Sequence, residues 1–160
     1  MRRISLILVT VALTLVLGAQ AAQAVSPHFI GEPVIAKSAQ TGLTVTWKAS
    51  GLGNVASGAF LTADSVVAQS TCVNKGGNVA PGQPLVIQDV TGPTTQIPPS
   101  NGQITFTVNL PPPPTPSSQD VCPNGNWSVR LDSLTYVGVE VHIQQGGVDI
   151  LTGSLGTIDP

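Results

Sequence analysis

The chain has 160 residues, of which 41% are hydrophobic, 4% aromatic and 9% charged, and its formal net charge is -2. A length near 150 residues is typical of one domain, and the charged fraction is far below the roughly 25% of an average soluble domain, so uncharged polar residues, Gly and Pro supply most of the polarity. This composition excludes disorder driven by charge repulsion, and the lack of a basic stripe excludes a nucleic-acid-binding surface.

The first 24 residues have the three parts of a secretory signal peptide. Residues 1–3 are a short cationic start, residues 4–17 are uncharged and largely apolar, and Ala22-Gln23-Ala24 places small residues where signal peptidase cuts. Ala19-Gln20-Ala21 also fits the cleavage pattern. As a helix, residues 4–17 span about 21 Å, short of the roughly 30 Å hydrocarbon core of a membrane. We therefore expect a signal peptide at 1–24 and a secreted, extracellular domain at 25–160 that has no contact with the membrane once the signal is removed.

Alternation of apolar and polar residues predicts strands along the whole mature chain. Turn residues separate them at Thr41-Gly42, 51–54, Asn101-Gly102 and Gly146-Gly147. The predicted strands cover residues 34–38, 43–49, 55–63, 66–73, 85–90, 103–109, 127–132, 136–143 and 148–151. These short strands, with no helical window free of Gly or Pro, predict an all-β fold.

Within the segment 136–143, Val137, Val139, Val141 and Ile143 form the predicted inward row, and Tyr136 and His142 are expected to face outward. A change of phase after Leu131 predicts a turn or bulge within residues 132–135.

About nine short strands in a chain of this length favour a single antiparallel β-sandwich, with a small barrel as the alternative. The sandwich is immunoglobulin-like in architecture only. In immunoglobulin domains a Trp follows the first Cys of the disulfide, whereas here Trp47 precedes Cys72 and Trp127 follows Cys122.

Cys72 and Cys122 are the two cysteines of the chain. An even number of cysteines in an exported chain predicts one disulfide, the alternative being two buried free thiols. Closing a loop of this length stabilises a fold by about 4 kcal/mol in the chain-entropy model.

Two segments, 74–84 and 110–126, escape the strand pattern, and a Cys72–Cys122 disulfide would place both at one end of the sandwich. Long loops are often functional, although they can also be spacers whose anchoring only stabilises the fold. Residues 111–114 and Pro116 predict a rigid polyproline stretch that guards a sheet edge. Trp127 suits either a ligand-binding face or the core. The candidate binding residues are Asn74, Lys75, Asn78, Asp120, Asn124, Asn126 and Trp127.

Motifs that carry catalysis or bind cofactors are missing from the sequence. His28 and His142 are the only histidines, so a three-histidine metal site is impossible, and Asp120, Asn124 and Asn126 do not match a calcium loop. No G-x-S-x-G, phosphate loop or dinucleotide fingerprint is present, and the acids form no recognisable glycosidase pair. We expect no cofactor and no catalytic residue. A Ser/His/acid triad stays open because its members need not be close in sequence.

Four segments carry a family resemblance: Pro27-His28-Phe29-Ile30-Gly31, Cys72-Val73-Asn74-Lys75-Gly76-Gly77, Cys122-Pro123-Asn124-Gly125-Asn126-Trp127 and Gln144-Gln145-Gly146-Gly147. Across nearly the whole mature chain, the sequence resembles a group of small uncharacterised secreted bacterial β-sandwich proteins with paired C-V-N-x-G-G and C-P-N-x-N-W segments. The resemblance implies export, one disulfide and a β-rich fold, with no established activity. A looser resemblance is to secreted β-sandwich apoproteins that carry enediyne chromophores, which have two disulfides where this chain can form one.

These features favour a secreted non-enzymatic binding or structural module that acts at the cell surface on a glycan or protein ligand. The first alternative is a soluble carrier of small molecules or a protein inhibitor. The second is a secreted hydrolase.

Overall fold

The computed structural model describes residues 26–98 and 102–160. The predicted signal peptide and Asn101 of one predicted turn lie outside these residues. The elements are β1 (His28–Ser38), β2 (Gly42–Ser50), β3 (Ser57–Val73), β4 (Val79–Pro81), β5 (Leu85–Thr91), β6 (Thr95–Ile97), β7 (Gln103–Leu110), α1 (Ser118–Val121), β8 (Ser128–Gln145) and β9 (Val148–Ile158).

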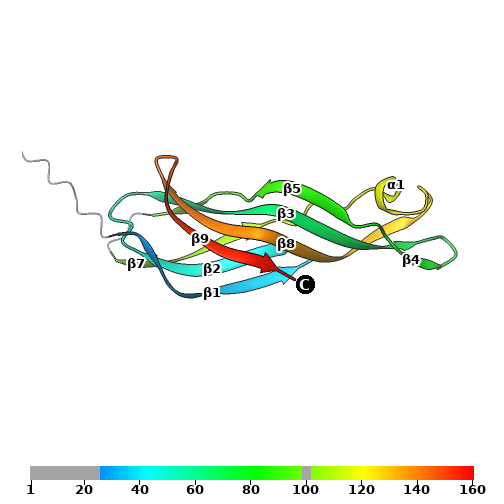
Figure 1. The fold of residues 1–160 in the computed structure, drawn as a ribbon, viewed down its shortest axis with the longest axis horizontal. Coiled ribbons are helices and arrows are strands. Elements are labelled where there is room, and N and C mark those ends of the chain that lie inside the picture. Colours follow the sequence, from blue (N-terminus) through cyan, green and yellow to red (C-terminus); the bar gives the residue numbers. More distant parts are fainter. Residues whose placement is uncertain (1–25, 99–101) are drawn as a thin grey trace, which may run out of the picture.

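The strands form two antiparallel sheets that run along the long axis of the molecule (Figure 1). The first sheet has the order β1-β2-β7. The second has the order β4-β3-β8-β9, and β5 and β6 pair with β3 on the edge that β4 also uses. Apolar side chains alternate along these strands, so each sheet has one face to bury, and packing the two faces together excludes water from both. The predicted all-β antiparallel sandwich is confirmed.

The core lies between the sheets, where the side chains of the two inner faces meet. The first sheet contributes Leu43, Val45 and Val108, each 0–1% exposed, and the second contributes Leu61 and Val141, each 0% exposed. The inward row predicted for residues 43–49 is thereby confirmed at Leu43, Val45 and Ala49, while Trp47 is half-buried at the side of the core.

Trp47 is held by contacts within the first sheet and not by the disulfide. Its ring stacks on Phe29 with centroids 4.1 Å apart, and its Nε1 donates a 2.8 Å hydrogen bond to the carbonyl oxygen of Gly31. The immunoglobulin pairing of a core Trp with a disulfide is therefore absent from the described residues, as the order of the residues in the sequence indicated.

Four strands are much longer than predicted: β1 and β9 have 11 residues each, where 34–38 and 148–151 were predicted, and β3 and β8 each join two predicted segments. β3 has 17 residues and joins the predicted segments 55–63 and 66–73, and β8 has 18 residues and joins 127–132 and 136–143. A strand can continue through a change of phase when a bulge absorbs the extra residue. The pattern predicted separate segments in β3 and either a turn or a bulge between the two segments of β8, and the structure has one uninterrupted strand in each case.

Bulges in β8 explain two wrong inward and outward assignments, those of Tyr136 and of Val137, which was placed in the inward row but is only half-buried. Gln69 pairs with Ser133 and Ser70 with Leu131, so the intervening Asp132 is an extra residue, which confirms the bulge predicted within 132–135. A second irregularity lies between Tyr136 and Val139 in the pairing with β9. Between the two irregularities the alternation is shifted by one residue, so Tyr136 is fully buried and not exposed as expected.

The turns follow the predicted glycines. Gly146 and Gly147 both have positive φ, 58° and 81°, and connect paired residues Gln145 and Val148 in a two-residue hairpin. Gly42 begins β2 with φ 80°, at a position where a side chain would overlap the carbonyl oxygen of Leu110. β4 and β6 were not predicted, because three residues are too few to show alternation.

Candidate functional site

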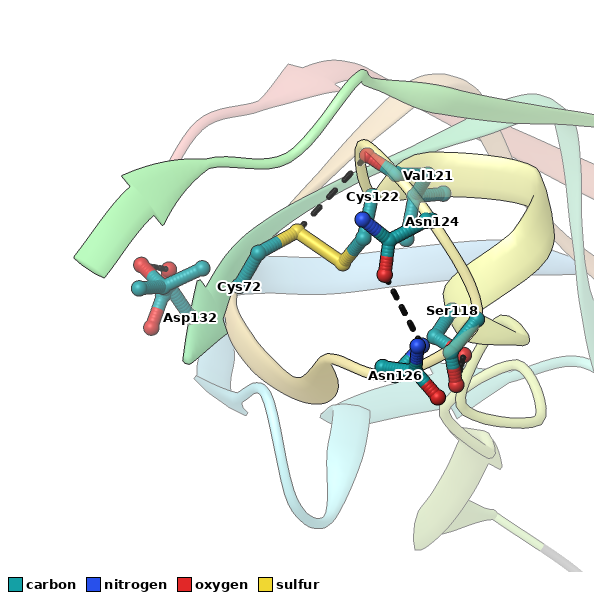
Figure 2. Close-up of a disulfide and its surroundings, with 9 residues drawn as sticks. Cys72, Ser118, Val121, Cys122, Asn124, Asn126 and Asp132 are labelled. Atoms are coloured by element: carbon teal, nitrogen blue, oxygen red, sulfur yellow. Dashed lines mark hydrogen bonds between the residues drawn. A yellow bond between two sulfur atoms is a disulfide. The ribbon is translucent and has the colours of Figure 1, made fainter. Parts of the chain in front are cut away.

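The predicted disulfide between Cys72 and Cys122 is present and joins the two loops (Figure 2). Cys72 lies at the end of β3 with 0% exposure, and Cys122 follows α1, with the two Cα atoms 5.8 Å apart. The backbone N–H of Gln83 donates a 2.8 Å hydrogen bond to the carbonyl oxygen of Val121. The disulfide therefore joins the end of β3 to segment 110–126, and the backbone hydrogen bond joins segment 74–84 to the same segment.

Segment 74–84 is more ordered than the sequence indicated. β4 pairs with the end of β3, so the segment is a hairpin whose turn contains Asn74 to Asn78. Oδ1 of Asn74 accepts hydrogen bonds of 2.9 Å from the backbone N–H groups of Gly76 and Asn78. Because backbone N–H groups donate, the atom that faces them must be the side-chain oxygen, and the amide NH₂ points elsewhere.

Segment 110–126 contains the short helix α1 and a second turn of the same kind. Oδ1 of Asn124 accepts a 3.1 Å hydrogen bond from the backbone N–H of Asn126, a bond that Figure 2 shows beside the disulfide. The carbonyl oxygen of Gly125 accepts a 3.3 Å bond from the hydroxyl of Ser118. These contacts connect the turn to α1, which the disulfide connects to β3.

A shallow depression of about 470 Å³ lies where the two turns meet. Its six lining residues are Asn74, Lys75, Gly76, Asn124, Asn126 and Trp127. Five of the seven candidate binding residues thus share one surface, although they come from segments some 50 residues apart.

The other two candidates do not line the depression. Asn78 closes the first turn through its backbone, and its carbonyl oxygen accepts a 3.0 Å bond from the N–H of Asn74. Asp120 lies in α1, where one carboxylate oxygen accepts a 2.5 Å bond from the hydroxyl of Ser117. Both residues support the loops without facing the depression.

Trp127 is half-buried and lies outside the cluster of side chains that form the core in the described residues. Because Trp127 begins an alternating segment, the sequence also allowed it a place in the core. The structure does not place it there. Trp127 lines the depression together with three amide side chains.

The chemistry of the depression is that of hydrogen bonding and stacking. Lys75 is the one charged side chain among the six lining residues. The side-chain oxygens of Asn74 and Asn124 are engaged by backbone N–H groups, and within the described residues neither Nδ2 group has a hydrogen-bond partner. The exposed groups are therefore mainly donors. Within residues 26–98 and 102–160, no group of three or more His, Cys, Asp or Glu side chains could hold a metal ion.

A charged pair lies next to this end of the sandwich, at the bulge in β8. Asp132 accepts hydrogen bonds from the hydroxyl of Thr71 and from Nε of Arg130, the latter at 2.9 Å. The hydrogen bond from Thr71 lowers the pKa of the Asp132 carboxyl below its ordinary value of 3.8, and the bond and charge of Arg130 lower it further, against the opposing effect of burial.

A second polar arrangement, which the sequence did not reveal, lies on the outer face of β3, β8 and β9. Nε2 of His142 is 3.0 Å from the hydroxyl of Thr62, and its Nδ1 is 3.1 Å from a carboxylate oxygen of Asp149. The imidazole stacks on Phe60 with centroids 4.9 Å apart, and only 14% of the side chain is exposed. His142 faces outward as predicted but is largely covered. Thr62 and His142 are 80 residues apart, so no local pattern could have signalled this contact.

The connectivity hydroxyl–imidazole–carboxylate is that of a nucleophilic triad, but the surroundings differ. Thr62 lies within β3 and pairs with Thr91 of β5 on one side and Glu140 of β8 on the other. A nucleophilic site also needs donors aimed at a developing oxyanion. The physical effect of this arrangement is to connect three strands.

The chain has a distant structural likeness to a solved protein. No protein-family model and no curated protein sequence matches the chain. Among solved structures, the chain is similar to the crystal structure of DesR, a β-glucosidase from Streptomyces venezuelae, in complex with D-glucose, with a TM-score of 0.35 and 20% sequence identity. The match covers 83% of this chain and 15% of that chain. A likeness at this score has no bearing on the fold or the activity of this protein.

Proposed function

We propose that this protein is a secreted, non-enzymatic binding module and that the depression at the disulfide end of the sandwich binds a glycan of the cell surface. The observation that supports this proposal best is the gathering of Asn74, Asn124, Asn126 and Trp127 around one depression by a disulfide. Sugars present hydroxyl oxygens at their edges and C–H groups on their faces. Amide donors suit the edges, and an aromatic ring suits a face.

The rigidity of the depression also supports a binding role. The two asparagine oxygens are used within their own turns, and the turns are fixed to β3 by backbone and covalent bonds. Side chains that are ordered before binding lose less conformational entropy when the ligand arrives, so a shallow surface can still give useful affinity.

The non-enzymatic part of the proposal rests on the lining itself. The six residues include no carboxylate, imidazole, hydroxyl or thiol side chain, which are the groups that most often act as nucleophile or general base. The arrangement around His142 lies on another surface and joins strands. Hydrolysis of a nitrophenyl ester that disappears in a His142→Ala variant would contradict this assignment.

The experiment uses an isosteric substitution. Asn124→Asp keeps the oxygen that accepts from Asn126 but replaces the amide donor by a carboxylate oxygen, so the turn is preserved while the depression loses a donor. Asn54→Asp is the matched control, because Asn54 is exposed in the segment that precedes β3, whereas the disulfide lies at the end of that strand. Both variants carry the same added charge.

Binding is measured by calorimetry with soluble oligosaccharides released from bacterial cell walls, and by retention on intact walls. We expect the wild type and Asn54→Asp to bind equally, and Asn124→Asp to bind about tenfold more weakly or worse, the equivalent of about 1.4 kcal/mol. Equal binding by all three proteins, or no binding of any wall glycan by the wild type, would show that the proposal is wrong.

A further inference from the structure

A small cavity, open to solvent on one side, lies where the end of β1 meets β8, at a place separate from the depression. Its volume is about 160 Å³, and it is bounded by the end of β1, the middle of β8 and the last residue of the chain. The lining residues are Lys37, Ser38, Ala39, Asp132, Ser133, Leu134, Tyr136 and Pro160. An apolar protein cavity of about 150 Å³ is large enough to hold a benzene molecule.

Tyr136 is the unusual member of this lining. Its side chain is 0% exposed, and its hydroxyl has no hydrogen-bond partner in the described residues. Buried hydroxyl groups are normally hydrogen-bonded, because a hydroxyl that loses its hydrogen bonds to water on burial and gains no other partner destabilises the fold. The bulges at Asp132 and before Val139 turn this tyrosine inward. The fold therefore buries a polar group beside a cavity and leaves it without a partner.

The remaining lining describes the chemistry that the cavity would accept. Leu134, Ala39 and Pro160 are apolar. Lys37 and Asp132 carry opposite charges, and the Asp132 carboxylate already accepts bonds from Thr71 and Arg130. A net charge on the ligand would gain little here, whereas an apolar body with one hydrogen-bonding oxygen would match both the apolar walls and the unpartnered phenol.

We propose that this cavity is a second binding site, for a small uncharged molecule with an apolar body of about one ring and an oxygen that accepts a hydrogen bond from Tyr136. The site is independent of the glycan surface, because none of its lining residues contributes to the depression at the disulfide end. Tyr136 acts as the residue that selects for the oxygen, and the volume of the cavity limits the size of the ligand.

The test compares two probes of nearly equal size, phenol and benzene, by calorimetry on the full mature protein. We expect phenol to bind the wild type about two- to tenfold more tightly than benzene, the difference that one net hydrogen bond makes. In Tyr136→Phe the cavity keeps its shape and loses the hydroxyl, so the preference for phenol should disappear. If Tyr136→Phe still binds phenol more tightly than benzene, the Tyr136 hydroxyl does not contact the ligand and the proposal is wrong on this point.

A second pair of variants tests whether the probes enter this cavity. Ala39→Leu adds bulk to the lining, and Ala36→Leu adds the same bulk at an exposed position of β1. We expect Ala39→Leu to abolish binding of both probes and Ala36→Leu to leave it unchanged. If neither probe binds the wild type, or if a crystal structure grown with phenol contains only a water molecule at the Tyr136 hydroxyl, the proposal is overturned. Glycan binding should be the same in all three variants, so failure here is distinguishable from failure of the glycan proposal.

Discussion

Removal of the disulfide should have the largest effect on stability of any change at the loop end. The bond joins residues separated by 50 positions, and in the chain-entropy model a closed loop of about that length restricts the unfolded chain by about 4 kcal/mol at 25 °C. Replacing both cysteines by alanine also removes the sulfur of Cys72, which is 0% exposed, at a further cost of about 1 kcal/mol. A typical domain is stable by about 5 to 15 kcal/mol, so the double variant should be near the limit of folding.

Three proteins separate the two contributions: the oxidised wild type, the wild type reduced with a thiol reagent, and the Cys72→Ala/Cys122→Ala variant. Reduction removes only the cross-link, whereas the double variant also removes the packed sulfur atoms. Urea unfolding, followed by the fluorescence of Trp47 and Trp127, gives the free energy of unfolding of each. We expect the reduced protein to lose about 4 kcal/mol and the variant about 1 kcal/mol more.

The slope of the unfolding free energy against urea provides the control. A cross-linked unfolded chain exposes less surface, so the slope should be larger for the reduced protein than for the oxidised one. If reduction changes the free energy of unfolding by less than about 1 kcal/mol, restriction of the unfolded chain is not what stabilises this fold and the loop-length reasoning is refuted.

Three further predictions concern backbone strain and titration. Gly42→Ala should lower the free energy of unfolding by about 3 kcal/mol or more, because φ is 80° and a Cβ would overlap a carbonyl oxygen of β7. Gly53→Ala, where φ is 67° and the space is open, should lower it by about 1 kcal/mol. Equal shifts of the urea midpoint in the two variants would contradict this. Burial raises the pKa of Tyr136 above 10.0, so the unfolded chain ionises first and stability should fall as the pH rises through 10, a loss that Tyr136→Phe should lack. The pKa of Asp132 lies below 3.8, chiefly because Thr71 donates a hydrogen bond to its carboxylate. The contribution of Asp132 to the stability of the fold is therefore present above pH 3.8 and lost as the pH falls through the lowered pKa. Thr71→Val should raise the pKa of Asp132 in an NMR titration.

The properties that the sequence predicts correctly are those that depend on neighbours along the chain. Alternation located the main strands, since a half-buried strand repeats every two residues wherever it lies in the fold. Glycine pairs located the hairpin turn at 146–147, because only glycine adopts positive φ at both positions without strain. The disulfide was predictable because the two cysteines of the chain allow one pairing.

The candidate surface was predictable in part for the same reason. The cysteines indicated that segments 74–84 and 110–126 meet, and five residues chosen from them line one depression. Asn78 and Asp120 were chosen by residue type, and their contacts within their own turns were not visible in the sequence. Which side of a turn faces outward depends on local hydrogen bonds that composition does not describe.

Composition, periodicity and the two cysteines thus determined that this chain is an all-β sandwich with one disulfide. Only the tertiary structure decided which way Tyr136 faces, because two bulges in β8 shift the alternation by one residue and shift it back. The same holds for the contact of Thr62 with His142 across 80 residues, since it depends on the register between β3 and β8. Register is set by how two whole strands fit a common core, and a one-residue shift moves every side chain to the opposite face.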